Sequence, residues 1–208
     1  QAAAYPVVDM RDGGRVKMVD GGVADDAPIL GGSSWYDTAL RGFSVGNINV
    51  GWDNYNKESV DDAINKVSEA LQGANKADTH ALLIGTANIE SARGETGKDV
   101  NRANIVGPMQ MSRIAHKEIM RRMKTKTNMK RNIQKLKQTD WGKDIKWDKV
   151  SYNDLKDPLL NVAFARLYYS IVKEPIPSTE IKRAKYWADY FNTDADVHGT
   201  PEAYLRAQ

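Results

Sequence analysis

Residues 88–111 read NIESARGETGKDVNRANIVGPMQM, a stretch in which an apolar helix ends at a glutamate, gives way to a polar loop and resumes at Gly-Pro-Met-Gln-Met. On the helix before the loop, Leu83, Ala87 and Glu90 fall at positions i, i+4 and i+7, so their side chains share one face. We therefore expect Glu90 on or beside the apolar face, at the helix C-terminus. Burial and the negative end of the helix dipole both raise a carboxyl pKa, so this position favours a protonated acid near neutral pH.

A carboxylic acid that holds its proton at neutral pH is what general acid catalysis requires. The alternative interpretation is structural, with Glu90 capping the helix or pairing with Arg93 or Arg102. Ser91 lacks the Gly-x-Ser-x-Gly elbow of a nucleophile, so we expect it to form a helix-end hydrogen bond instead.

The surrounding sequence predicts a mainly α body. Val60, Ile64, Val67 and Leu71 recur at spacings of three and four, which indicates an amphipathic helix that stops at Gly73. A break is expected over 139–158. Further helices are expected from Asp78 or Thr79 to about Gly94, from near Met109 through a long basic stretch, over 157–174, and over 178–192.

Residues 1–50 have a different pattern, with short β-prone pieces between Asp-Gly-Gly-like turns and no helical period. We expect an extended, Gly-rich docking arm or linker that needs a partner surface, either the body at 51–208 or another protein. A disordered leader is the alternative. The start QAAAYPVV has no initiator Met and is no intact signal peptide, so the chain is expected to be processed or numbered from within a longer product.

Composition narrows the function classes. A chain of 208 residues suits one domain with an appendage, and its net charge of +3 does not by itself indicate a nucleic-acid protein. The absence of cysteine excludes disulfides, thiolate zinc sites and cysteine nucleophiles. No apolar run approaches the roughly 18 residues of a membrane span. His80, His116 and His198 lack ligand spacing, so neither a metal nor a cofactor is expected.

Charge is concentrated in residues 113–137, which carry ten Lys or Arg and one Glu, within a basic insertion at about 113–150. This run is either a solvated helix face or a contact for a polyanion such as a cell-wall polymer, lipopolysaccharide or nucleic acid. No aromatic residue interleaves it, so a base-stacking nucleic-acid surface is not expected. Trp141 and Trp147 follow the run and either line a sugar groove or pack in the core.

Three pieces, spanning about residues 78–200, resemble the goose-type-lysozyme-like lytic transglycosylases that cleave peptidoglycan. Ile-Glu-Ser, a polar loop and Gly-Pro-Met-Gln are similar to the family's catalytic Glu-Ser and Gly-Leu-Met-Gln. DPLLNVAFARLYY is similar to its Asp-Pro-x-x-Asn helix, and AKYWADYFNT to its later Ala-x-x-x-Tyr-Asn element. Two departures are Pro108, in place of the usual Leu, and Phe191, which interrupts the Tyr-Asn pair.

The resemblance implies a lysozyme-like helical domain that cuts the bond between N-acetylmuramic acid and N-acetylglucosamine in peptidoglycan glycan strands. Glu90 would be the single catalytic residue of this lytic transglycosylase. Hydrolysis, as in a muramidase, is the second choice and would need a second carboxylate, for which Glu95 and Asp99 are the loop candidates. The resemblance implies substrate binding by Ser91, Gly107, Met109, Gln110, Tyr190 and Asn192.

The docking arm and the lack of a secretion signal indicate a setting in a phage virion or tail, from which the chain acts on the cell wall or periplasm. Two rival functions stay open. One is an architectural virion protein with an inactive lysozyme-like fold, which Pro108 favours. The other is a polyanion-binding module centred on residues 113–137.

Overall fold

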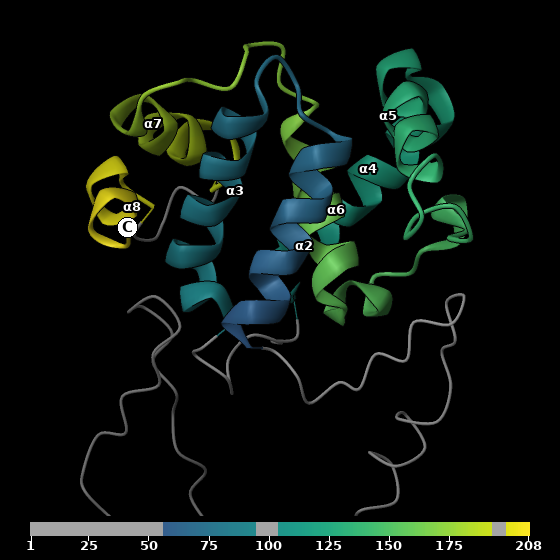
Figure 1. Ribbon diagram of the computed structural model, residues 1–208, viewed down its shortest axis with the longest axis horizontal. Helices are drawn as coiled ribbons and strands as arrows, with labels where there is room; N and C mark the ends of the chain where they lie inside the picture. The colour runs from purple at the N-terminus through teal and green to yellow at the C-terminus, as the bar shows by residue number, and fades with distance from the viewer. Residues whose placement is uncertain (1–55, 95–103, 193–198) are drawn as a thin grey trace, which may run out of the picture. The chain divides into compact units, whose positions relative to one another are not determined.

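The computed structural model describes residues 56–94, 104–192 and 199–208, and these ranges are mainly helical, as predicted (Figure 1). The predicted arm at 1–50 lies outside the described residues. The α-helices are α2 (Lys57–Ala70), α3 (Lys76–Ser91), α4 (Arg113–Thr125), α5 (Thr127–Lys137), α6 (Pro158–Tyr169), α7 (Glu180–Tyr190) and α8 (Pro201–Arg206). Short 3₁₀ helices lie at η1 (Ala92–Gly94), η3 (Trp147–Lys149) and η4 (Asn153–Lys156), and two short strands at β1 (Ile105–Val106) and β2 (Met111–Ser112).

Helix α6 lies at the centre of the core, with α2 packed beside it (Figure 1). Asp157 caps its start by accepting a hydrogen bond of 2.8 Å from the Leu160 backbone N–H, and Pro158 occupies its first turn. The predicted apolar stripe of α2 faces this helix, because Val60, Ile64 and Val67 are fully buried. Helix α3 also packs on α2, and α4 packs on α6. Sequence periodicity therefore identified the buried face of α2 correctly.

Helix α3 differs from its prediction at both ends. It begins at Lys76 rather than at Asp78 or Thr79, because the side chain of Asn75 accepts a hydrogen bond of 2.9 Å from the Ala77 N–H and is the true cap. It ends at Ser91, and the chain then enters η1 through left-handed backbone at Ala92 (φ 48°) and Arg93 (φ 56°). The helix terminus that carries Glu90 is thus followed at once by a sharp turn.

The helix expected to begin near Met109 begins at Arg113 instead, capped by Ser112. Met109 lies in the turn of a small antiparallel hairpin, in which Ile105 pairs with Ser112 and Val106 with Met111. Left-handed backbone at Gly107 (φ 73°) and Gln110 (φ 48°) excludes a helix over the turn. The prediction of one long basic helix is also wrong, because the extended backbone of Lys126 separates α4 from α5.

The C-terminal part contains a helix that the sequence analysis missed. Helix α8 packs on α7 and α3, and its Thr200 cap and Pro201 are recognisable start signals. Tyr204 of α8 is buried against Gly85 of α3, where an added Cβ would overlap the tyrosine hydroxyl. Helix α6 ends at Tyr169, five residues before the predicted end at Glu174. None of the helices described is long and apolar enough to cross a lipid bilayer.

Candidate active site

Glu90 lies in the last turn of α3, on the side that the sequence predicted. Leu83 and Ala87, its neighbours on that face, are both fully buried, while Glu90 itself keeps part of its surface exposed. The side chain therefore stands where the buried face of α3 meets solvent. A proton donor needs this combination of desolvation and access to a ligand.

The Glu90 carboxyl is held by a side chain from a distant part of the chain. The indole Nε1–H of Trp187, on α7, donates a hydrogen bond of 3.1 Å to its Oε1 atom. Trp187 is only 1% exposed and packs against the ring of Tyr204, with 5.6 Å between the ring centroids. Because Gly85 lets Tyr204 approach α3 closely, the packing of α8 and α7 on α3 fixes the indole that orients Glu90.

Desolvation by the surrounding protein raises the pKa of Glu90 to about 7, while the hydrogen bond from Trp187 acts in the opposite direction. The helix dipole favours the neutral acid as well, because Glu90 lies at the negative end of α3. The predicted direction of the pKa shift is therefore confirmed. Arg93, one of the two predicted structural partners, pairs with Asp61 instead at 3.1 Å, and Arg102 lies outside the described residues.

Ser91 connects the end of α3 to the turn of the hairpin. Its hydroxyl donates a hydrogen bond of 2.8 Å to the Pro108 carbonyl and accepts one of 2.9 Å from the Gly94 N–H. The residue is 3% exposed. The expected helix-end hydrogen bond is thus present, and it ties the turn at 107–110 to the end of α3.

Asn161 of α6 holds the same turn from the other side. Its Oδ1 atom accepts a hydrogen bond of 2.8 Å from the Met109 N–H, and its Nδ2 atom donates to the carbonyls of Val106 and Leu155, each at 2.8 Å. A Cβ on Gly107 would overlap this amide, so glycine is needed for space as well as for its positive φ. Asn161 is the Asn of the Asp-Pro-x-x-Asn pattern, a signal that was available in the sequence but was not assigned a site role.

The two remaining turn residues have different environments. Met109 is fully buried in the core, so its side chain supports the turn and has no surface with which to contact a glycan. Gln110 is partly exposed, adopts left-handed backbone and donates a hydrogen bond of 2.8 Å from Nε2 to the Gly107 carbonyl. Of these two predicted substrate-binding residues, Gln110 is the one with an accessible side chain.

The predicted C-terminal contributors, Tyr190 and Asn192, lie at the end of the helix that supplies Trp187. The Tyr190 ring packs edge-on against Tyr186, at 5.0 Å between centroids, and Asn192 donates its N–H to the Trp187 carbonyl at 3.1 Å. Both side chains are partly exposed. These two residues thus lie at the end of α7 near Trp187. Within the described ranges neither forms a hydrogen bond with Glu90.

Phe191, which lies between them, is linked to α3 through the side chain of Tyr169. Its ring stacks on Tyr169 at 4.9 Å, and the Tyr169 hydroxyl forms a hydrogen bond of 2.8 Å with the hydroxyl of Thr86. Thr86 lies one turn before Glu90 on α3. Phe191, which interrupts the family pattern, therefore has a packing role here.

Other candidates are structural within the described ranges. Trp147 is 1% exposed and donates its indole N–H to the Gly142 carbonyl at 3.0 Å, and Trp141 packs against it, which favours the core alternative for both. No cluster of His, Asp or Glu in the described part of the chain could hold a metal ion. Glu95 and Asp99, the candidate second carboxylates, and His198 lie outside it.

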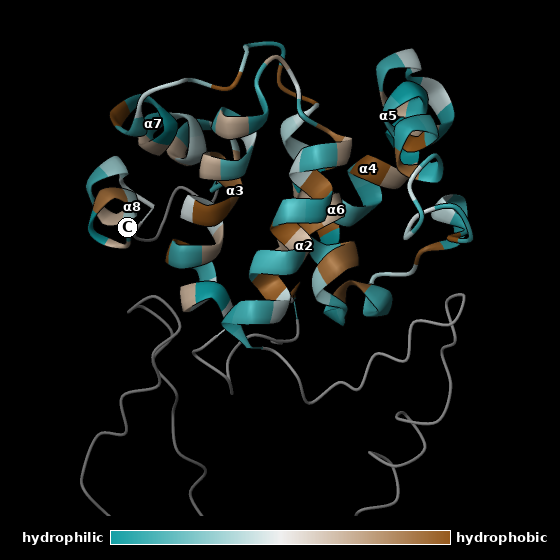
Figure 2. Ribbon diagram, in the orientation of Figure 1, coloured by the Kyte–Doolittle hydropathy of each residue, from teal (hydrophilic) through white to brown (hydrophobic). Residues whose placement is uncertain are grey.

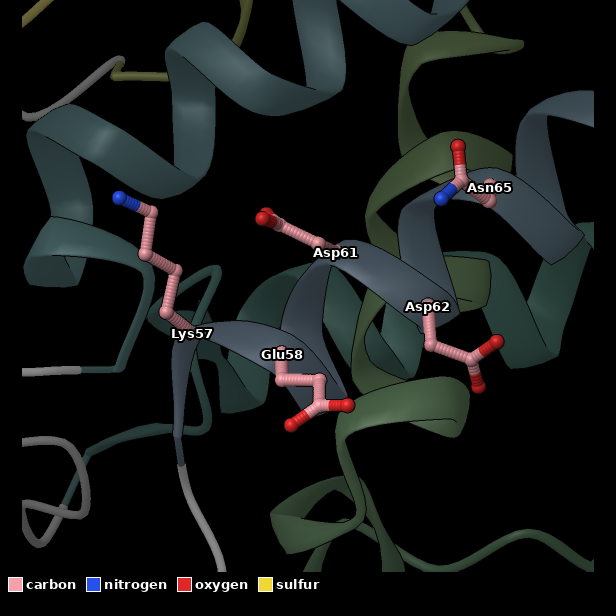
Figure 3. Close-up of a pocket in the computed structure, with 5 residues that line it drawn as sticks. All are labelled: Lys57, Glu58, Asp61, Asp62 and Asn65. Atoms are coloured by element: carbon pink, nitrogen blue, oxygen red, sulfur yellow. The ribbon is translucent and has the colours of Figure 1, made fainter.

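An open depression of about 500 Å³ lies on α2 (Figure 3). It is lined by Lys57, Glu58, Asp61, Asp62 and Asn65. The side chains of Asp61 and Asp62 point apart in Figure 3, and each has a basic partner, Arg93 and Lys66 respectively. This surface is a paired, solvated helix face and does not form part of the candidate site.

Comparison with known proteins identifies no matching family model, no matching curated protein and no matching solved structure. The functional interpretation therefore rests on the geometry around Glu90 and on the motifs that the chain carries.

Proposed function

We propose that this chain cleaves the glycan strands of peptidoglycan by lytic transglycosylation, with Glu90 as the single acid and base. The observation that carries the proposal is a partly exposed carboxyl whose pKa is raised to about 7, oriented by the Trp187 indole. A lysozyme-like fold is part of the proposal. It is supported by two hydrogen bonds that join the resembling motifs. Ser91 at the end of α3 and Asn161 of α6 both hold the Gly-Pro-Met-Gln turn.

The hydrogen bond from Trp187 supports a defined proton position. An indole N–H can only donate, and the carbonyl oxygen of a carboxylic acid is its better acceptor, so the bond to Oε1 of Glu90 favours the acid proton on Oε2. With a pKa near 7, a large fraction of Glu90 holds this proton at neutral pH. Oε2 is therefore the atom assigned to protonate the leaving oxygen of the glycan.

The proposed reaction needs no co-substrate. Glu90 gives its proton to the glycosidic oxygen between N-acetylmuramic acid and N-acetylglucosamine, and the bond from that oxygen to the muramic C1 breaks. The 6-hydroxyl of the same muramic residue forms a new bond to C1 and returns its proton to the Glu90 carboxylate. The products are a 1,6-anhydromuramic end and a free N-acetylglucosamine end. The attacking hydroxyl is already tethered to the reacting sugar, which gives it an intramolecular advantage.

The proposed route differs from hydrolysis in needing no second carboxylate. A hydrolase usually holds a second carboxylate at about 5–9.5 Å from the acid, depending on its stereochemistry. Glu95 and Asp99, the candidate second carboxylates, lie outside the described residues, and the pKa of Glu90 is raised by desolvation alone, against the hydrogen bond from Trp187. A single group that serves as acid and then as base fits this arrangement.

The proposed place of action is the cell wall or periplasm, with the chain carried there as a phage virion or tail component. The support is the motif resemblance together with the arm-like composition of residues 1–50. A protein partner that docks this arm belongs to the same proposal.

Product chemistry tests the proposed function. Purified peptidoglycan is digested with the full chain and with Glu90→Gln, and the released muropeptides are analysed by mass spectrometry. We expect muramic ends lighter by one water than those left by a hydrolase, and no release by the Gln variant. Reducing muramic ends throughout would show hydrolysis, and undiminished release by Glu90→Gln would remove Glu90 from the mechanism.

A further inference from the structure

The charge of this chain is unevenly distributed. Residues 113–137 carry ten Lys or Arg and one Glu, a net charge of +9, whereas the whole chain carries only +3. The remaining residues therefore have a net charge of −6. An anionic surface would repel most of the chain and attract this one segment.

Helices α4 and α5 expose most of these cations to solvent. Ile119 and Met123 of α4 and Met129 and Leu136 of α5 are buried, which fixes the apolar side of each helix against the core. The exposed cations lie away from these anchors. They are Arg113, Lys117, Arg121, Lys124, Lys126, Lys130, Arg131, Lys135 and Lys137. Figure 2 shows that α5 is largely hydrophilic along its length.

Most of these cations have no acidic partner within the described ranges. Glu118, the one acidic residue of the segment, already accepts hydrogen bonds from Arg121 at 2.8 Å and from Arg122 at 2.5 Å. No ion pair in the described part of the chain includes the six cations from Lys124 onward, although exposed lysines elsewhere, such as Lys66 and Lys185, do form pairs. We call these six the α4–α5 basic face; they are Lys124, Lys126, Lys130, Arg131, Lys135 and Lys137.

Stabilisation of the helices accounts for only part of this face. Lys124 lies in the last turn of α4, and Lys135 and Lys137 lie in the last turn of α5, where cations complement the helix dipole. Lys126 and Lys130 lie at the positive start of α5, which has no acidic residue in its first turn and no side-chain cap. Positive charges at this end are unfavourable to the helix dipole, so helix stabilisation does not explain Lys126 and Lys130.

We propose that the α4–α5 basic face binds a phosphodiester polymer of the cell wall. Repeated single negative charges on a flexible backbone match a row of exposed lysine ammonium groups, each of which acts as a point charge. No aromatic residue occurs in 113–137 to stack on a base, which favours a polymer without bases over a single-stranded nucleic acid. The choice of a wall polymer rests on the proposed function, because such polymers are attached to the glycan that Glu90 would cut.

Binding at this face would hold the net-negative remainder of the chain close to the wall. The contact would raise the effective concentration of glycan strands at Glu90 without contacting Glu90 itself. Affinity should fall steeply as salt is added, because exposed charge pairs are screened within about 8–10 Å at physiological ionic strength.

The test measures binding separately from cleavage. The full chain carrying Glu90→Gln is sedimented with purified walls that retain their phosphodiester polymers and with walls stripped of them by hydrofluoric acid. The test variant carries Lys→Gln at Lys124, Lys130, Lys135 and Lys137. The matched control carries Lys→Gln at four exposed lysines elsewhere, Lys146, Lys149, Lys173 and Lys182, so both lose the same charge. Poly(glycerol phosphate) and duplex DNA serve as soluble competitors at equal phosphate concentration.

We expect salt-sensitive binding to intact walls, weaker by about tenfold or more in the test variant and little changed in the control. Equal binding to stripped walls, or an equal loss in the control, would overturn the proposal. More effective competition by duplex DNA than by poly(glycerol phosphate) would overturn the choice of partner in favour of nucleic acid. Since no cleavage is measured, failure of the Glu90 chemistry and failure of this binding are distinguished.

Discussion

Trp187 and Glu90, separated by 97 positions in the sequence, are joined by a hydrogen bond of 3.1 Å from the indole N–H to the carboxylate oxygen. The bond links α7 to the last turn of α3 and sets two properties of the acid at once. It makes Oε1 of Glu90 the acceptor of the indole hydrogen bond, and it limits how far desolvation raises the pKa of Glu90.

Replacement of Glu90 by Gln should abolish peptidoglycan cleavage and leave the fold intact. The amide has nearly the size of the carboxyl but cannot protonate a leaving oxygen. General acid–base catalysis contributes about 10²–10⁴-fold, and here one group performs both steps. Release of soluble muropeptides measures the loss, and circular dichroism checks the fold. A correctly folded Gln variant that retains most of its activity would contradict the assignment.

The same substitution should change how stability depends on pH. The pKa of Glu90 is raised from 4.5 to about 7 in the folded chain, so below pH 4.5 the residue is neutral in both the folded and unfolded states. As pH rises from 4.5 to 7, the unfolded chain ionises first and the folded state loses stability, by about 3 kcal/mol in total. The amide of the variant does not ionise in either state. Urea titrations at pH 4 and pH 8 should therefore show Glu90→Gln gaining stability relative to the original chain at the higher pH.

Trp187→Phe should alter the pH profile of cleavage. The indole hydrogen bond lowers the Glu90 pKa, so its removal should move the basic limb, expected near pH 7, to higher pH. Loss of the orienting contact should also reduce kcat by about tenfold, the equivalent of about 1.4 kcal/mol. Trp147→Phe is the matched control, since Trp147 is equally buried and donates to the Gly142 carbonyl. An unchanged limb in Trp187→Phe would show that the indole has only a packing role.

Gly107→Ala and Gly73→Ala should lower the free energy of unfolding by different amounts, although both glycines have left-handed backbone, with φ of 73° and 68°. At Gly73 the nearest atom to an added Cβ is a guanidinium nitrogen of Arg166 at 3.1 Å, so the cost should be mainly backbone strain of about 1–2 kcal/mol. At Gly107 the Cβ would also displace the buried Asn161 amide, which adds about 1–3 kcal/mol. Denaturant unfolding compares the two, and equal losses would show that Asn161 does not hold the turn rigidly.

The sequence itself determined the helical body and the environment expected for Glu90. The apolar repeats of α2 and α3 follow from 3.6 residues per turn, so Leu83 and Ala87 were correctly predicted to share a face with Glu90. The raised pKa could be predicted in direction for the same reason, because burial and the helix end act locally. Element boundaries were less accurate. The cap of α3 is Asn75 and not Asp78, and two nearby polar residues give nearly the same local signal.

Only the tertiary structure decided which distant side chain meets Glu90 and which one holds the turn at 107–110. Trp187 bonds to Glu90 and Asn161 to the Met109 N–H through contacts between elements, and the helical period of one segment does not predict the partner that it faces. The turn at 107–110 was expected to start a helix, yet tertiary hydrogen bonds from Ser91 and Asn161 hold its backbone in a hairpin. Local propensity is worth tenths of a kcal/mol per residue, and a few buried hydrogen bonds outweigh it. The sequence pattern was enough to identify Glu90 as the candidate acid. The packing of α7 on α3 determined how the Glu90 carboxyl is oriented, and the packing of α6 determined how the turn at 107–110 is held.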